Sequence, residues 1–100
     1  MLSPVQEQNL RALCEKYFIA RLWLFGSAAT DKFDPESSDI DLLVEFGEPK
    51  DMSPAAQYFD FWEELKALFG RHVDLVERKA IRNPHFLASI NGRERLLYAA

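Results

Sequence analysis

Hydrophobic side chains recur every three or four positions in two segments of the chain, a spacing that places them on one face of a helix. Each segment follows a Ser-Pro pair, Ser3-Pro4 in the first and Ser53-Pro54 in the second. Serine favours the position before a helix, and proline fits the first helical position. We therefore predict one helix from the first pair to about Tyr17 and another from the second pair to Gly70.

Shorter apolar runs between and after these helices predict β-strands. The run at residues 22–25 consists of large aliphatic and aromatic side chains and stops at Gly26, so we expect a buried strand there. Residues 39–46 alternate in part between polar and apolar and end before Gly47, and residues 72–76 form another such run. The pattern thus predicts three strands.

The remaining segments carry weaker patterns. Residues 31–38 contain Pro35 and many turn-forming residues, which predicts a loop. Asn83-Pro84 predicts the start of a short last helix, and residues 95–98 fit either an edge strand or a helical tail. The order of elements predicts an α/β or α+β fold in which helices pack on a small mixed β-sheet.

Composition limits the size and class of the protein. The chain has 100 residues, of which 48% are hydrophobic, and this suffices for one small core. We expect a single domain over residues 1–100, soluble and cytoplasmic, because no apolar stretch is long enough for a membrane span or resembles a signal segment. The lone Cys14 falls in the apolar stripe of the first helix, which predicts core packing.

Charge is distributed unevenly along the sequence. Residues 31–48 contain seven acidic residues and one basic residue, a local balance of −6, so this segment repels phosphates unless cations intervene. Residues 71–95 carry six basic and three acidic residues, a balance of +3. That excess is too small to indicate a dedicated nucleic-acid binder, and we expect no direct nucleic-acid binding and no membrane association.

Two aspartates open the predicted strand at residues 39–46. Side chains at positions i and i+2 of a strand share a face, so Asp39 and Asp41 project together while Ile40 and Leu42 point into the core. Two carboxylates this close repel, and the pKa of one rises unless a cation lies between them. Mg²⁺ prefers such oxygen ligands together with substrate phosphates. The alternative is a solvated strand entrance or a helix cap.

Gly26 and Ser27 follow the buried strand at residues 22–25. Glycine lets the backbone approach a ligand closely, and the following amides with the Ser27 hydroxyl can donate hydrogen bonds to a phosphate. The alternative is a simple turn, since Gly-Ser commonly serves that purpose. In combination with the aspartate pair, the phosphate-binding interpretation gains weight.

The series of strand, Gly26-Ser27, loop and Ser-Asp-Ile-Asp-Leu-Leu-Val resembles the signature of the DNA polymerase β-like nucleotidyltransferase superfamily, specifically its minimal nucleotidyltransferases. The resemblance covers residues 25–98 and implies a palm-like fold. Residues 73–76 are similar to the strand that brings a third carboxylate in that family.

The resemblance implies a role for each matching residue. It implies that Gly26 and Ser27 bind the phosphates of ATP, and that Asp39 and Asp41 hold two Mg²⁺ ions. It also implies that Asp74 completes the metal site and helps to deprotonate the attacking hydroxyl. From the residues alone, an ion pair with Arg71 or Arg78 is the alternative for Asp74.

Similar minimal proteins pair with a small helical HEPN-type toxin and, as antitoxins, transfer AMP from ATP to a tyrosine of that toxin. The resemblance therefore implies an Mg²⁺-dependent adenylyltransferase with a HEPN-type partner. One alternative is a non-catalytic antitoxin or interaction module. Its basis is Ala28, Ala29 and Thr30, where family members carry arginines, a loop longer by one residue, and aromatics such as Phe59 and Phe86 that a small core cannot all bury. Another is a small-molecule nucleotidyltransferase that acts as a homodimer.

The two histidines complete the candidate residues. His72 at a strand start and His85 near a helix start are typical of surface or capping positions, so we do not expect them to be ligands. The sequence contains no Cys/His cluster of the kind that binds zinc.

Overall fold

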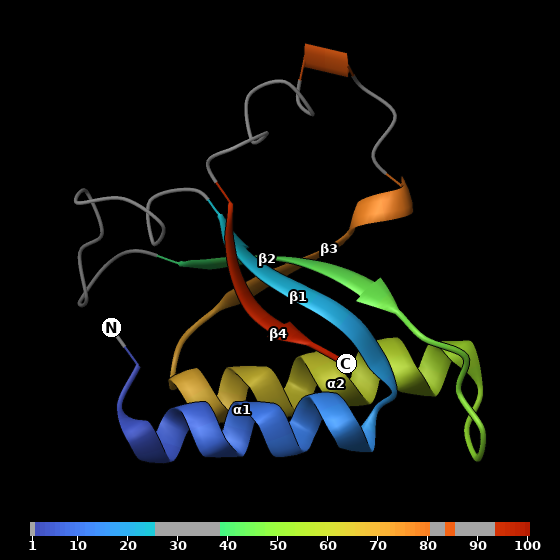
Figure 1. Ribbon diagram of the computed structural model, residues 1–100, viewed down its shortest axis with the longest axis horizontal. Coiled ribbons are helices and arrows are strands. Elements are labelled where there is room, and N and C mark those ends of the chain that lie inside the picture. The colour runs from blue at the N-terminus through green and yellow to red at the C-terminus, as the bar shows by residue number, and fades with distance from the viewer. Residues whose placement is uncertain (1, 26–38, 81–83, 86–93) are drawn as a thin grey trace.

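Two helices pack on one face of a four-stranded mixed sheet (Figure 1). The computed structural model describes residues 2–25, 39–80, 84–85 and 94–100. In chain order the elements are α1 (Pro4–Lys16), β1 (Ile19–Phe25), β2 (Ile40–Phe46), α2 (Pro54–Phe69), β3 (Val73–Glu77), the 3₁₀ turn η2 (Arg78–Ala80) and β4 (Arg95–Ala99). The predicted fold class is confirmed.

Both helices begin at the predicted Ser-Pro pairs. The Gln6 amide donates to the Ser3 hydroxyl at 3.1 Å and the Ser3 amide donates to the Gln6 side chain at 3.0 Å, which completes a capping box. The Ala56 amide donates to the Ser53 hydroxyl at 3.1 Å. Helix α2 ends at Gly70, whose φ of 66° is the left-handed conformation that glycine adopts without steric cost.

The sheet has the strand order β3-β2-β1-β4. Strand β1 pairs antiparallel with β2 and β4, whereas β2 and β3 are parallel. Strand β1 begins at Ile19, three residues before the predicted start, because Ile19 pairs with Phe46 of β2. Pairing with β1 also makes residues 95–99 an edge strand, so the alternative of a helical tail is wrong.

Several sequence expectations lie partly or wholly outside the described residues. The predicted loop at residues 31–38 is one of them. Of the predicted last helix, the structure describes only Pro84 and His85, and both are helical.

Strands β2 and β3 each begin one residue after their predicted starts, which leaves Asp39 and His72 immediately before them.

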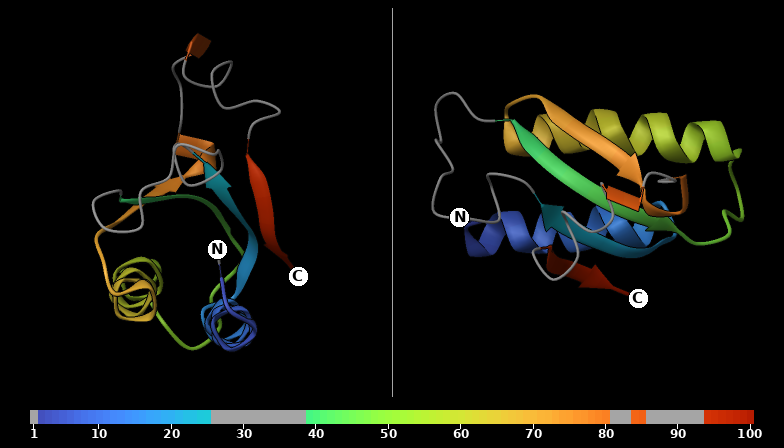
Figure 2. Two further views of the ribbon diagram at one scale, coloured as in Figure 1. Left: turned by 90° about the vertical axis from the view of Figure 1, so that its left-hand side faces the viewer. Right: turned by 90° about the horizontal axis from the view of Figure 1, so that it is seen from above.

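The main core lies between the sheet and the two helices, which the end-on view of the helices makes clear (Figure 2). Cys14 is fully buried there, as the sequence predicted. Alternation along β2 sends Ile40, Leu42 and Val44 into this core. A smaller apolar cluster of Trp23, Phe25, Leu43 and Val76 lies apart from it, formed by the alternate residues of the strands. The alternate side chains therefore project from the face that the helices leave open.

Candidate active site

The parallel pairing of β2 and β3 brings the predicted acidic residues together. Asp41 lies opposite Asp74 in the register of the two strands, and Phe25, the last residue of β1, lies opposite Asp41 on the other side. The ends of three strands thus meet at one place. Asp39 immediately precedes β2, and its carboxylate oxygen lies within 4.8 Å of an oxygen of Asp74.

Strand alternation explains the direction of these side chains. Because Ile40 and Leu42 are buried under the helices, Asp41 between them projects to the open face, where it is half-buried. Asp74 projects similarly between the buried Val73 and Leu75, and about half of its side chain is exposed. The strands themselves therefore position both carboxylates.

The site has an excess of negative charge. The pKa of the Asp41 carboxyl is raised from 3.8 to about 6, first by partial burial and then by a hydrogen bond with Asp74 and the charges of Asp74 and Asp39. His72 opposes this rise in the Asp41 pKa. The sequence predicted such a shift for closely spaced carboxylates. A cation between these groups would remove the repulsion, so the donor set fits a divalent metal ion.

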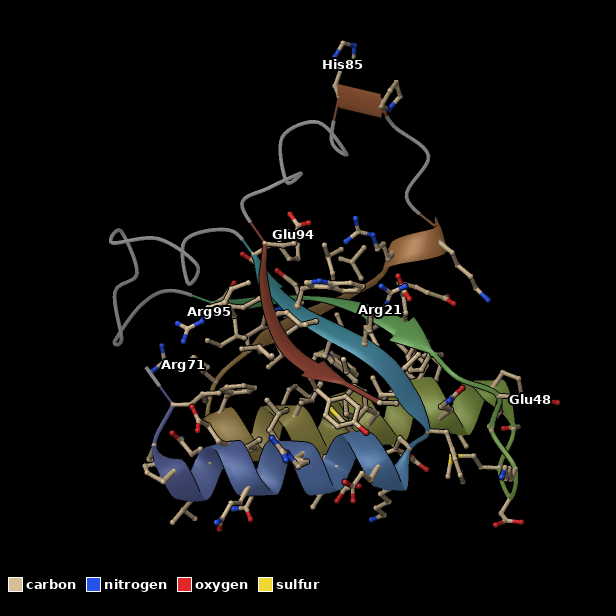
Figure 3. All side chains as sticks on the ribbon, viewed as in Figure 1. Arg21, Glu48, Arg71, His85, Glu94 and Arg95 are labelled. Carbon is tan, nitrogen blue, oxygen red and sulfur yellow. The ribbon has the colours of Figure 1, made fainter. Side chains whose placement is uncertain are left out.

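His72 is exposed, as expected of a surface residue, and it lies beside this acidic group. Its Nε2 lies 2.9 Å from Oδ1 of Asp74, and the two side chains are 53% and 52% exposed. The sequence feature that could have indicated the proximity of His72 to Asp74 is their i, i+2 spacing, because alternate residues of an extended segment share a face. Arg78, an expected alternative partner of Asp74, instead lies 3.8 Å from Glu94. Glu94 immediately precedes β4 (Figure 3).

A cavity of about 420 Å³ adjoins the acidic group. Asp41 and Asp74 line it together with three aromatic side chains, Phe25, Tyr58 and Trp62. Tyr58 donates to the carbonyl of Leu75 at 2.5 Å, and Trp62 Nε1 donates to the carbonyl of Val73 at 2.7 Å. These bonds fix the two α2 side chains to β3, beside the carboxylates.

The predicted phosphate-binding pair, Gly26 and Ser27, lies outside the described residues. These residues directly follow Phe25, whose partner in the sheet is Asp41. The role of Gly26 and Ser27 stays a prediction.

Comparison with known proteins identifies relatives and structural neighbours. The family described as "Nucleotidyltransferase domain" matches residues 7–97. A protein of Methanocaldococcus jannaschii, provisionally named a protein adenylyltransferase, is 37% identical over 97 residues, covering 97% of this chain and 93% of the relative.

Two solved structures share the fold. One is a crystal structure of a toxin-antitoxin with AMP-PNP, with a TM-score of 0.68 and 19% identity over 94% of this chain and 73% of that chain. The other is a tri-AMPylated Shewanella oneidensis HEPN toxin in complex with MNT antitoxin, with a TM-score of 0.61 and 17% identity over 96% of this chain and 71% of that chain.

In the part of the chain that the structure describes, no helix has the length and apolar character required to span a membrane.

Proposed function

Because the chain belongs to the nucleotidyltransferase domain family, we propose that it transfers AMP from ATP to a tyrosine of a HEPN-type toxin and thereby acts as its antitoxin. The observation that carries this proposal is the meeting of Asp39, Asp41 and Asp74 at the starts of two parallel strands. The adenylyltransferase name of the relative and the AMPylated HEPN toxin in the structural neighbour support the choice of group and acceptor.

In this proposal, Asp39, Asp41 and Asp74 hold two Mg²⁺ ions. The raised pKa of Asp41 supports the assignment, since the charges of Asp74 and Asp39 disfavour its ionised form and a bound cation would offset them. When bound, the ions would neutralise the carboxylates and stabilise charge on the attacking and leaving oxygens. Gly26 and Ser27 would hold the ATP phosphates through backbone amides and the serine hydroxyl.

The proposed reaction is an in-line displacement at the α-phosphorus of ATP. The tyrosine oxygen forms a bond to that phosphorus, and the bond from phosphorus to the pyrophosphate oxygen breaks. The phenolic proton passes to a carboxylate, for which Asp74 is our candidate because it faces the cavity beside Asp41. The products are an AMP-tyrosine ester and pyrophosphate.

The acceptor side of the site would come from the partner protein. We infer that residues 1–100 act as one minimal nucleotidyltransferase domain, and the aromatic walls formed by Tyr58 and Trp62 offer one side of a pocket. A partner that inserts a tyrosine ring beside them would place its hydroxyl near the carboxylates. The partner would therefore complete the active site.

An incubation with ATP labelled at the α-phosphate, Mg²⁺ and a lysate of the protein's own host tests this function. The purified protein should label one protein band, whose mass identifies the acceptor, and Asp41→Asn should abolish that label. Asp51→Asn is the matched control, because Asp51 is an exposed aspartate beyond the opposite end of β2. Undiminished labelling by Asp41→Asn would contradict the proposed site.

A second candidate function is a non-catalytic antitoxin that neutralises its partner by binding alone. The observation in its favour is Phe59 on α2, whose side chain is 57% exposed and contacts the ring of Tyr58. An exposed aromatic of this size is common at interaction surfaces. Calorimetry distinguishes the two functions, because a chain that binds no Mg²⁺-ATP cannot be the transferase.

A further inference from the structure

We propose that His72 is a metal ligand of this site, whose imidazole nitrogen makes the site favour Zn²⁺ or Co²⁺ over Mg²⁺ more strongly than the carboxylates alone would. The proposal rests on the proposed function in one respect, namely that Asp39 and Asp74 hold a divalent cation. It adds a residue that the resemblance to polymerase β-like enzymes does not supply, and it concerns which cation the site selects.

The first argument is the distance between His72 and Asp74. Two ligand atoms on one ion, with bonds of about 2.0–2.1 Å, lie roughly 2.9 Å apart in octahedral geometry and roughly 3.3–3.4 Å apart in tetrahedral geometry. Nε2 of His72 and Oδ1 of Asp74 are 2.9 Å apart. In the metal-free protein this contact is a hydrogen bond or ion pair, and an ion could replace it without moving either side chain far.

The second argument is the backbone that holds His72 beside Asp39. The Ile40 amide donates to the carbonyl of His72 at 3.1 Å, where β2 and β3 begin their parallel pairing. Asp39 precedes Ile40 directly, so this bond places Asp39 and His72 side by side where the two strands begin. One ligand atom from each of Asp39, His72 and Asp74 lies within 4.8 Å of the others. One ion can therefore contact all three residues with small rotamer adjustments.

The third argument is chemical. Mg²⁺ takes oxygen ligands and retains several waters, whereas imidazole suits Zn²⁺ and the later first-row metals. About half of each of the His72 and Asp74 side chains is exposed, so water and substrate oxygens can complete the coordination. Replacing one oxygen ligand by a nitrogen weakens the preference for Mg²⁺ and strengthens that for Zn²⁺ or Co²⁺.

Imidazole ¹⁵N NMR during Zn²⁺ and Mg²⁺ titrations tests this assignment directly. The sequence contains two histidines, so His85 is an internal reference in the same spectrum. His85 lies well apart from the sheet (Figure 3). We expect Zn²⁺ to shift Nε2 of His72 and to leave both nitrogens of His85 unchanged at one equivalent.

Calorimetric titrations of variants then separate a ligand from a positioning residue. His72→Ala should weaken Zn²⁺ or Co²⁺ binding by about 10–100-fold and Mg²⁺ binding by less than about threefold. His72→Gln, which can still donate to Asp74, should not restore Co²⁺ affinity. His85→Ala is the matched control, and circular dichroism checks that each variant is folded.

Three results would overturn the assignment. These are an unshifted His72 Nε2 at saturating Zn²⁺, an equal loss of Mg²⁺ and Co²⁺ affinity in His72→Ala, and full recovery of affinity in His72→Gln. The last two would make His72 a positioning residue for Asp74. None of these measurements includes ATP or an acceptor. If Zn²⁺ shifts the His72 signal but the protein transfers no AMP, only the proposed function is refuted. If the protein transfers AMP but the His72 signal does not shift, only the His72 assignment is refuted.

Discussion

The two faces of the sheet carry different kinds of side chain. The face under α1 and α2 is almost wholly apolar, and its fully buried Leu42 shares the main core with Phe61 of α2. The open face has a smaller apolar cluster around Trp23, next to a group of mutually repelling carboxylates at the strand ends. The covered face supplies most of the stability of the fold, and the open face gives up some stability to hold the site.

Two carboxylates illustrate the difference, Glu64 on α2 over the covered face and Asp41 on the open face. Glu64 of α2 accepts a hydrogen bond from Tyr17 and lies 3.2 Å from Lys16, and these contacts lower its pKa. Asp41 has neighbouring carboxylates, and its pKa rises to about 6. Ionisation of Glu64 therefore stabilises the fold, whereas ionisation of Asp41 destabilises the metal-free protein. A carboxylate kept at such a cost is typical of a functional site.

The largest expected effect is on the covered face. Phe61 is fully buried and contacts the rings of Tyr17 and Phe46 at centroid distances of 5.7 and 6.5 Å. Phe61→Ala should lower the free energy of unfolding by about 3–5 kcal/mol, through lost burial and the cavity left behind. Urea denaturation measures this change. The control Phe59→Ala, at an exposed site on the same helix, should change stability by less than about 0.5 kcal/mol.

The second effect concerns Asp41 on the open face, where one substitution should lower activity and raise the stability of the metal-free protein. Asp41→Asn should reduce AMP transfer by more than ~100-fold, equivalent to about 2.7 kcal/mol, since even outer-shell partners of metal ligands contribute ~10–100-fold. The same change should stabilise the metal-free protein at pH 7 by about 1 kcal/mol or less, because Asp41 is only half-buried.

The pH dependence of this stabilisation has a definite sign. The native pKa of Asp41 is about 6 and the ordinary value is 3.8, so the native state binds more protons between these values and loses stability as pH rises through that range. Thermal melts should show Asp41→Asn above the wild type at pH 7 and the gap closing below about pH 4. An equal gap at all pH values would contradict the assigned carboxyl repulsion.

The third effect is on a polar group of the covered face. The buried Gln57 side chain donates to the carbonyl of Tyr17 at 2.7 Å and to that of Gly47 at 3.0 Å, which ties α2 to the turn before β1 and to the end of β2. Gln57→Leu should destabilise the fold by about 1–3 kcal/mol, because two carbonyls lose their donor. Guanidinium denaturation measures this change in the free energy of unfolding. One such hydrogen bond typically contributes about 1 kcal/mol, so a loss below about 0.5 kcal/mol would show that water replaces the Gln57 side chain.

The smallest effect concerns Glu64. Glu64→Gln should destabilise the protein at pH 7 by about 0.5 kcal/mol, as is usual for a partly exposed pair. Because its native pKa lies below the ordinary 4.5, this contribution is present above pH 4.5 and disappears as the pH falls through the native value. Melts of both proteins at pH 7 and pH 3 check the sign, and a gap that widens in acid would be inconsistent with it.

The candidate site was predictable in part. The aspartate pair is a local pattern, since strand alternation with the buried Ile40 and Leu42 identifies which residues project to the open face. Asp74 entered the prediction through a resemblance, because nothing local indicates that β3 lies parallel to β2. The role proposed for His72 depends on that pairing, which brings it beside Asp39. Gly26 and Ser27 stay predictions from the sequence.

By itself, the sequence determined the features that depend on near neighbours in the chain. Ser-Pro pairs and Gly70 set the helix ends, and the apolar spacing set which faces are buried, because capping and periodicity act over a few residues. Tertiary structure alone decided that β1 begins at Ile19 and that residues 95–99 form an edge strand. It also decided that Asp39, His72 and Asp74 lie within reach of one ion, since hydrogen bonds between strands join residues more than thirty positions apart.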